Sequence, residues 1–152
     1  METMAPIRPA LQRPRRISLP AGPTAPFEAR SQVGAYICSW EVPVDPYTAA
    51  LLTSELVTNA VRHELTDSVM LVISCTWGQL RVDVHDTSPS MPVPIEAPVD
   101  AEAGRGLKLV ATMATDWGWY RTCAGKAVYF MLAFDDLMAV ENGRPDRDRA
   151  AV

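Results

Sequence analysis

The chain has few cysteines, no long apolar run and no excess of positive charge. Its three cysteines, Cys38, Cys75 and Cys123, are far apart and include no Cys-x-x-Cys pair, which argues against a disulfide framework and against a zinc site. The longest uninterrupted apolar run, residues 127–134, is far shorter than the ~20 residues of a membrane-spanning helix. Lys and Arg total 14 against 18 Asp and Glu, a net charge of -4, so electrostatic binding to nucleic acid is not expected.

Length and composition indicate one globular domain. A chain of 152 residues is too short for two ordinary domains, and a domain of this size buries roughly 68–70% of the surface of its unfolded chain. We expect a flexible arm over residues 1–14, a folded domain over 15–137 and a disordered, charged tail over 138–152. The N-terminal arginines are followed by no apolar segment, so the sequence predicts no secretory signal and a cytoplasmic protein.

Hydrophobic periodicity and cap signals predict a mixture of strands and helices. Asp45 followed by Pro46 is a typical helix start, and residues 80–86 alternate cleanly between apolar and polar. The predicted packing is an α/β fold of the α+β two-layer sandwich type, a mostly antiparallel mixed sheet with helices on one face. The predicted strands are 16–20, 68–76, 80–86, 116–121 and 127–134, and the predicted helices are about 24–40, 46–63 and 104–114.

The segment 52–63 places a narrow polar stripe on an otherwise apolar helix. Glu55 and Asn59 lie one turn apart on the same face. The amide oxygen of Asn59 can ligate a hard cation, the carboxylate of Glu55 can take a proton from a hydroxyl, and Arg62 can meet a phosphate. Taken alone, such a stripe is more often the solvated face of an amphipathic helix.

Two further segments carry the same kind of chemistry. Asp86 ends a strand with a carboxylate that could accept a hydrogen bond from an amine, although an acidic residue that starts a turn is also common. The segment Gly104-Arg105-Gly106-Leu107 opens a predicted helix, and bare amides at a helix start bind anions. The alternative for the segment 104–107 is a flexible helix start that binds no anion.

In this order and spacing, the three segments resemble the boxes of the GHKL ATPase superfamily, which has the Bergerat ATP-binding fold. Glu55 and Asn59 match the N box, Asp86 matches the G1 box, and 104–107 match the G2 box. The short chain is similar to the bacterial anti-sigma regulatory factors of the serine-protein kinase type. Trp117-Gly118 and the closing segment 125–130 are also typical of that family, and the resemblance extends over roughly residues 17–134.

Three positions depart from the family pattern. Ser88 and Ser90 stand where the G1 box usually has glycine, and side chains there reduce backbone freedom beneath a nucleotide. A threonine that supports the adenine often opens the last strand, and Ala127 is expected at that place. The two serines favour an alternative function, a non-catalytic protein-binding regulatory module with the same fold and weak or no ATP turnover, whereas the intact Glu55 and Asn59 oppose it. A plain α/β domain without nucleotide would require all three boxes to be coincidental.

The resemblance implies an ATP-dependent protein-serine/threonine kinase. It would bind ATP and Mg²⁺, phosphorylate a serine of an anti-sigma factor antagonist and sequester a sigma factor, as a homodimer without direct contact to nucleic acid or membrane. Glu55 would be the catalytic base, Asn59 the magnesium ligand and Asp86 the reader of the adenine amine, with 104–107 as the phosphate lid. The other implied nucleotide-binding residues are Arg62, Ser88, Gly104, Arg105, Gly106 and Leu107.

Overall fold

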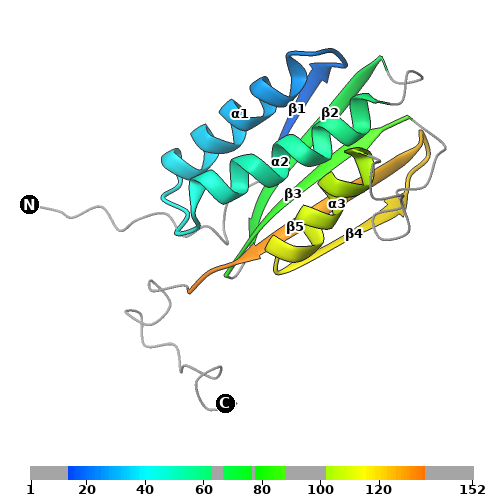
Figure 1. Ribbon diagram of the computed structural model, residues 1–152. Coiled ribbons are helices and arrows are strands. Elements are labelled where there is room, and N and C mark those ends of the chain that lie inside the picture. The colour runs from blue at the N-terminus through cyan, green and yellow to red at the C-terminus, as the bar shows by residue number, and fades with distance from the viewer. Residues whose placement is uncertain (1–13, 63–66, 77, 88–101, 136–152) are drawn as a thin grey trace, which may run out of the picture.

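Five strands form one antiparallel sheet in the order β1-β2-β3-β5-β4 (Figure 1). The computed structural model describes residues 14–62, 67–76, 78–87 and 102–135, with the backbone alone described over 102–106. The predicted arm and tail therefore lie almost wholly outside the described residues, and the domain boundaries stay predictions. The elements are β1 (Arg15–Pro20), α1 (Ala25–Ser39), α2 (Pro46–Val61), β2 (Ser68–Thr76), β3 (Gln79–Asp86), α3 (Glu102–Met113), β4 (Asp116–Arg121) and β5 (Lys126–Ala133).

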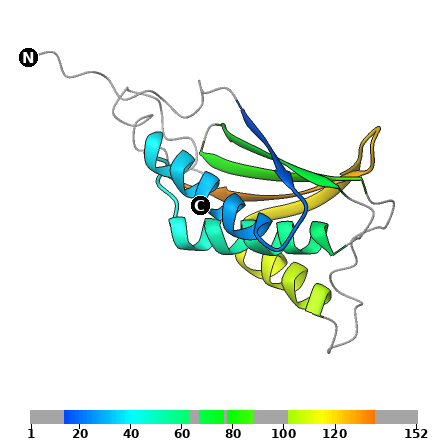
Figure 2. The ribbon, with the colours of Figure 1, turned by 90° about the horizontal axis from the view of Figure 1, so that it is seen from above.

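All three helices lie on one face of the sheet, which makes the molecule a two-layer sandwich (Figure 2). The predicted fold class is thereby confirmed, and every predicted element agrees with the structure within two residues. The start of α2 shows why the cap signal works. The Asp45 carboxylate accepts hydrogen bonds from the backbone N–H of Tyr47 at 3.2 Å and from the Thr48 hydroxyl at 2.7 Å, and Pro46 occupies the first turn.

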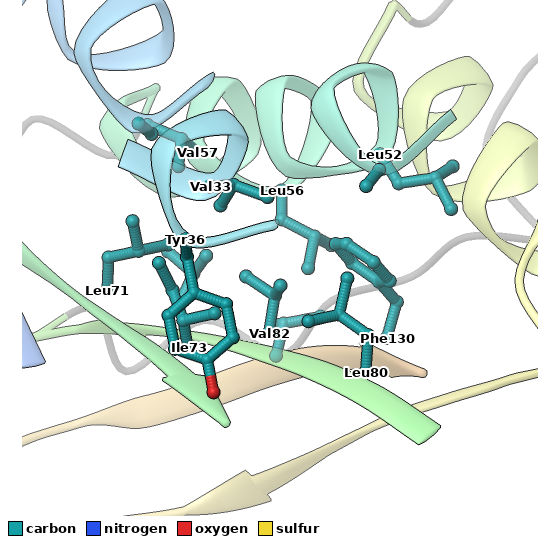
Figure 3. Close-up of a cluster of buried hydrophobic side chains, with 14 of the residues drawn as sticks. Val33, Tyr36, Leu52, Leu56, Val57, Leu71, Ile73, Leu80, Val82 and Phe130 are labelled. Carbon is teal, nitrogen blue, oxygen red and sulfur yellow. The ribbon is translucent and has the colours of Figure 1, made fainter. Parts of the chain in front are cut away.

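The core lies between the helices and the face of the sheet that they cover (Figure 3). On β3 the alternate residues Leu80, Val82 and Val84 are buried, and Phe130 lies opposite Val82 on β5. Apolar side chains of α1 and α2 fill the other side of this layer. None of the described helices is long and apolar enough to span a membrane. The core side chains labelled in Figure 3 are Val33, Tyr36, Leu52, Leu56, Val57, Leu71, Ile73, Leu80, Val82 and Phe130.

Four element ends lie at the same end of the molecule: the C-terminal ends of α2 and β3, and the N-terminal ends of β5 and α3. Met70, near the start of β2, pairs with His85, and Asp86 at the end of β3 pairs with Lys126 at the start of β5. Helix α2 ends just before β2 begins. Helix α3 finishes beside the start of β4, at the opposite end, so its N-terminus returns to the end where β3 finishes. These four ends lie together in both ribbon views (Figures 1 and 2).

The face of the sheet turned away from the helices carries an ordered polar and aromatic cluster. Arg81 donates from Nε and Nη2 to the two carboxylate oxygens of Asp83, at 2.8 and 2.9 Å, and its guanidinium carbon lies 4.1 Å from the centre of the Tyr129 ring. The Tyr120 hydroxyl donates to Asp83 Oδ2 at 2.8 Å. Burial, followed by this hydrogen bond, raises the pKa of Tyr120 to about 12, so the hydroxyl remains a donor that ties β4 to β3.

Candidate functional site

Helix α2 supplies the first two residues of the candidate site. Asn59 is 8% exposed and Glu55, one turn earlier, is half-buried, so the pair borders the core instead of forming a fully solvated stripe. Neither side chain makes a hydrogen bond or an ion pair within the part of the chain that the structure describes. An amide and a carboxylate placed one turn apart in this way are available to a ligand. Arg62, the C-cap residue of α2, is exposed at the same end.

Asp86 and Lys126 form the most buried ion pair of the described residues. Their side chains are 1% and 3% exposed, and Lys126 Nζ donates to Asp86 Oδ1 at 3.1 Å. Both residues belong to the helix-facing side of the sheet, in the same alternation as Val84 and Val128. The carboxylate that was predicted to read an amine therefore already accepts a hydrogen bond from an amine of the protein itself. Sequence reasoning did not assign Lys126 to the site.

The position of Ala127 corrects one expectation. Ala127 pairs with His85 on β3, and side chains alternate along a strand, so Ala127 points to the face away from the helices. It is fully buried, yet it does not belong to the core cluster beneath the helices. Ala127 and Asp86 therefore lie on opposite faces of the sheet, so Ala127 is not placed to support a group that Asp86 binds. The first residue of β5 on the helix-facing side is Lys126.

Gly125 lets the ends of β3 and β5 approach each other closely. A Cβ atom at this position would lie 2.3 Å from the carbonyl oxygen of Asp86 and 2.6 Å from the Cα atom of Thr87. Both neighbours are backbone atoms, which cannot rotate away as a side chain would. Only glycine fits here without a shift of one strand end, so this contact fixes the position of the Asp86–Lys126 pair.

Replacing Gly125 with alanine should therefore destabilise the fold. We expect the free energy of unfolding, measured by urea titration, to fall by about 1–3 kcal/mol, the usual effect of overpacking. Gly34→Ala is the matched control, because a Cβ atom at this α1 position meets nothing within 4 Å. That control should raise stability by roughly 0.5–1 kcal/mol, since alanine favours helix. Equal effects of the two substitutions would contradict the role of Gly125.

Helix α3 begins at Glu102, two residues before its predicted start. Gly104 and Gly106 therefore lie within the first turns of the helix, and the backbone N–H groups of the first turn have no partner within the helix. Leu107 is 2% exposed in the core, where it anchors this end of α3 beside Val110. The side chain of Arg105 and the whole of Ser88 lie outside the described residues, and so does most of the loop 87–103.

The structure thus brings Asn59, Asp86 and the start of α3 to one end of the sandwich, with Glu55 one turn before Asn59 on α2. No three His, Cys, Asp or Glu side chains gather as a metal site within the described ranges. A magnesium ion held by Asn59 would take its remaining ligands from phosphate oxygens and water, which is how this ion is usually bound with nucleotides. The amide oxygen at this position fits such a role.

Comparison with known proteins supports the fold. The crystal structure of the RsbU and RsbW domains of Rv1364c from Mycobacterium tuberculosis is similar to this chain, with a TM-score of 0.59 and 18% sequence identity. The similarity covers 80% of this chain and 32% of that one, so the chain spans about a third of its neighbour's length. At this identity the likeness shows the fold alone. No family model matches the chain, and no curated protein matches it in sequence.

Proposed function

We propose that this protein is an ATP-binding anti-sigma regulatory factor of the serine-protein kinase type, a partner-switching regulator. It phosphorylates a serine of an anti-sigma factor antagonist and sequesters a sigma factor, as a homodimer. The observation that carries the proposal is the meeting of Asn59, Asp86 and the start of α3 at one end of a two-layer sandwich. The likeness in fold to a structure that contains an RsbW domain supports it.

Each residue has a role that its position allows. The first-turn amides of α3 bind phosphate oxygens, and Arg62 adds a positive charge at the same end of the molecule. Asn59 ligates magnesium, which supplies charge neutralisation on the phosphates when it is bound. Glu55 lies one turn away on the same face of α2, where its carboxylate accepts the proton of the incoming serine hydroxyl. Catalysis is then mainly positioning and electrostatic stabilisation.

Asn59→Ala should abolish stabilisation by magnesium and ATP while leaving the fold intact. A ligand present at 100 times its dissociation constant adds about 2.7 kcal/mol to the free energy of unfolding. We expect ATP with Mg²⁺ to raise the melting temperature of the wild type but not of the variant, in a thermal-shift titration. Thr58→Ala, a neighbouring half-buried position on α2, is the control and should respond as the wild type does. An equal response of Asn59→Ala would exclude Asn59 as the metal ligand.

The Asp86–Lys126 pair favours a second candidate, the non-catalytic module. A carboxylate already bound to a buried ammonium is a less available acceptor for an adenine amine. In this version the sigma factor or the antagonist is bound without nucleotide turnover. Calorimetric titration of ATP with Mg²⁺, followed by transfer of radiolabelled phosphate to candidate antagonists, separates the two functions. Binding with transfer identifies the kinase, and capture of a sigma factor without transfer identifies the module.

A further inference from the structure

Lys126 carries more hydrogen-bonding capacity than the described part of the chain uses. An ammonium has three N–H donors, and a buried ammonium is costly unless its donors meet acceptors. Lys126 is 2% exposed, and Asp86 Oδ1 is the one acceptor that its Nζ atom meets within the described part of the chain. A second acceptor brought by a ligand would therefore find a charged donor already in place.

The donor is also held rigidly. Asp86 and Lys126 are register partners at the end of β3 and the start of β5, and Gly125 lies so close to the backbone of residues 86 and 87 that a Cβ atom would clash there. A strand end fixed by backbone contact leaves little freedom to the first side chain on the helix-facing side. The carboxylate and the ammonium thus present an acceptor and a donor side by side, within 3.1 Å of each other.

We propose that Lys126 is a specificity-determining residue of the nucleotide site and donates a hydrogen bond to a ring nitrogen of the base. This inference rests on the proposed function, in which Asp86 accepts a hydrogen bond from the amino group of the same base. Adenine carries its amino donor at C6 directly beside the N1 acceptor, so it matches both members of the pair. Lys126 thereby makes the ion pair a two-point reader of the base edge, where Asp86 alone would read one point.

A two-point reader discriminates more strongly than one carboxylate does. A 6-oxopurine held in the same pose places an acceptor against the carboxylate of Asp86 and an N–H donor against the ammonium of Lys126. Both contacts are then mismatched at a buried site. A ligand that leaves buried polar groups unpaired loses affinity, and this loss is the source of the specificity. Selection of adenine over guanine and hypoxanthine should therefore depend on both residues.

Modified nucleotides test the contact atom by atom in the unaltered protein. Calorimetric titrations with Mg²⁺ would compare ATP, 1-deaza-ATP, which lacks the N1 acceptor, and 7-deaza-ATP, which keeps it. We expect 1-deaza-ATP to bind the wild type about 10- to 100-fold more weakly than ATP, as for a lost hydrogen bond to a charged group. The 7-deaza control should bind like ATP. Equal affinity for ATP and 1-deaza-ATP would overturn the inference without touching the proposed function.

Lys126→Met completes the comparison. In this variant ATP and 1-deaza-ATP should bind equally, because the donor that distinguishes them is gone, and inosine triphosphate should be rejected less strongly than by the wild type. If the variant still discriminates against 1-deaza-ATP, another residue reads N1 and the inference is wrong. If the variant does not fold, the titrations on the wild type decide alone. Failure of the wild type to bind ATP at all would instead overturn the proposed function.

Discussion

Replacing Glu55 with glutamine is expected to slow phosphoryl transfer by about 10²–10⁴-fold, the usual contribution of a general base. The substitution keeps the size of the side chain and removes its charge and basicity. Glu55 is half-buried and makes no ion pair within the described residues, so the change should disturb the fold little. Nucleotide binding should persist, because in the proposed mechanism the carboxylate acts on the incoming hydroxyl and not on the nucleotide. Single-turnover transfer of phosphate to the antagonist is the measurement.

Retention of the sigma factor is a second measurement for this variant. A protein that retains its sigma factor but cannot phosphorylate the antagonist should hold the sigma factor permanently, and a pull-down beside the kinetics would show this. Glu28→Gln is the matched control, since Glu28 is a half-buried glutamate in the first turn of the neighbouring helix α1. Transfer at the wild-type rate by Glu55→Gln would remove Glu55 from the mechanism. Sigma capture by a wild type that transfers no phosphate would identify the binding module.

Lys126→Met should cause the largest loss of stability. Removing one partner of a buried ion pair leaves an uncompensated charge, which costs about 3–5 kcal/mol. The Asp86 side chain is 1% exposed, so water cannot replace the ammonium without a rearrangement of the strand ends. We expect the urea midpoint to fall accordingly with little change in the slope of the transition. Lys108→Met, at an exposed position of α3, should change stability by no more than about 0.5 kcal/mol.

The double variant Lys126→Met/Asp86→Leu separates charge from packing. Replacing both members of a buried pair with apolar residues is often neutral or stabilising, so most of the lost stability should return. The double variant should nevertheless bind ATP much more weakly than the wild type, because both groups that we propose to contact the base are gone. A double variant as unstable as Lys126→Met would mean that the lysine stem, and not the charge pair, supports the fold. Recovery of stability with loss of binding would show that the pair is retained for recognition.

The sequence predicted the elements well because their signals are local. Asp45 and Pro46 mark a helix start by hydrogen bonding within one turn, and the alternation over 80–86 is a property of one strand. The start of α3 was placed two residues late, because the paired glycines were interpreted as a helix entry when Glu102 already lies in the helix. Glu55, Asn59 and Asp86 were found from the residue pattern itself, and the roles that the resemblance gave them stay predictions.

Lys126 could not be found in the same way. A lysine that follows Gly125 is easily interpreted as a turn residue, and its partner Asp86 stands 40 positions earlier in the chain. Only the pairing of β3 with β5 shows that the two face each other, and only their burial shows that the pair is largely shielded from solvent. The face on which Ala127 lies also follows only from this pairing. In a strand the face of a residue depends on the register, and an error of one position reverses it.

The position of β5 between β3 and β4 also sets the order in which the sheet can fold. Hairpins form within microseconds, and β2–β3 and β4–β5 close over only two and four intervening residues, 77–78 and 122–125. Docking of β5 on β3 instead closes a long loop. The chain must lose the conformational entropy of this loop before contacts between the two strands can offset the loss. We therefore expect this docking to be the slow step in folding. A ligand that bridges the two strand ends should then act mainly by slowing unfolding, because its contacts would form only after this step.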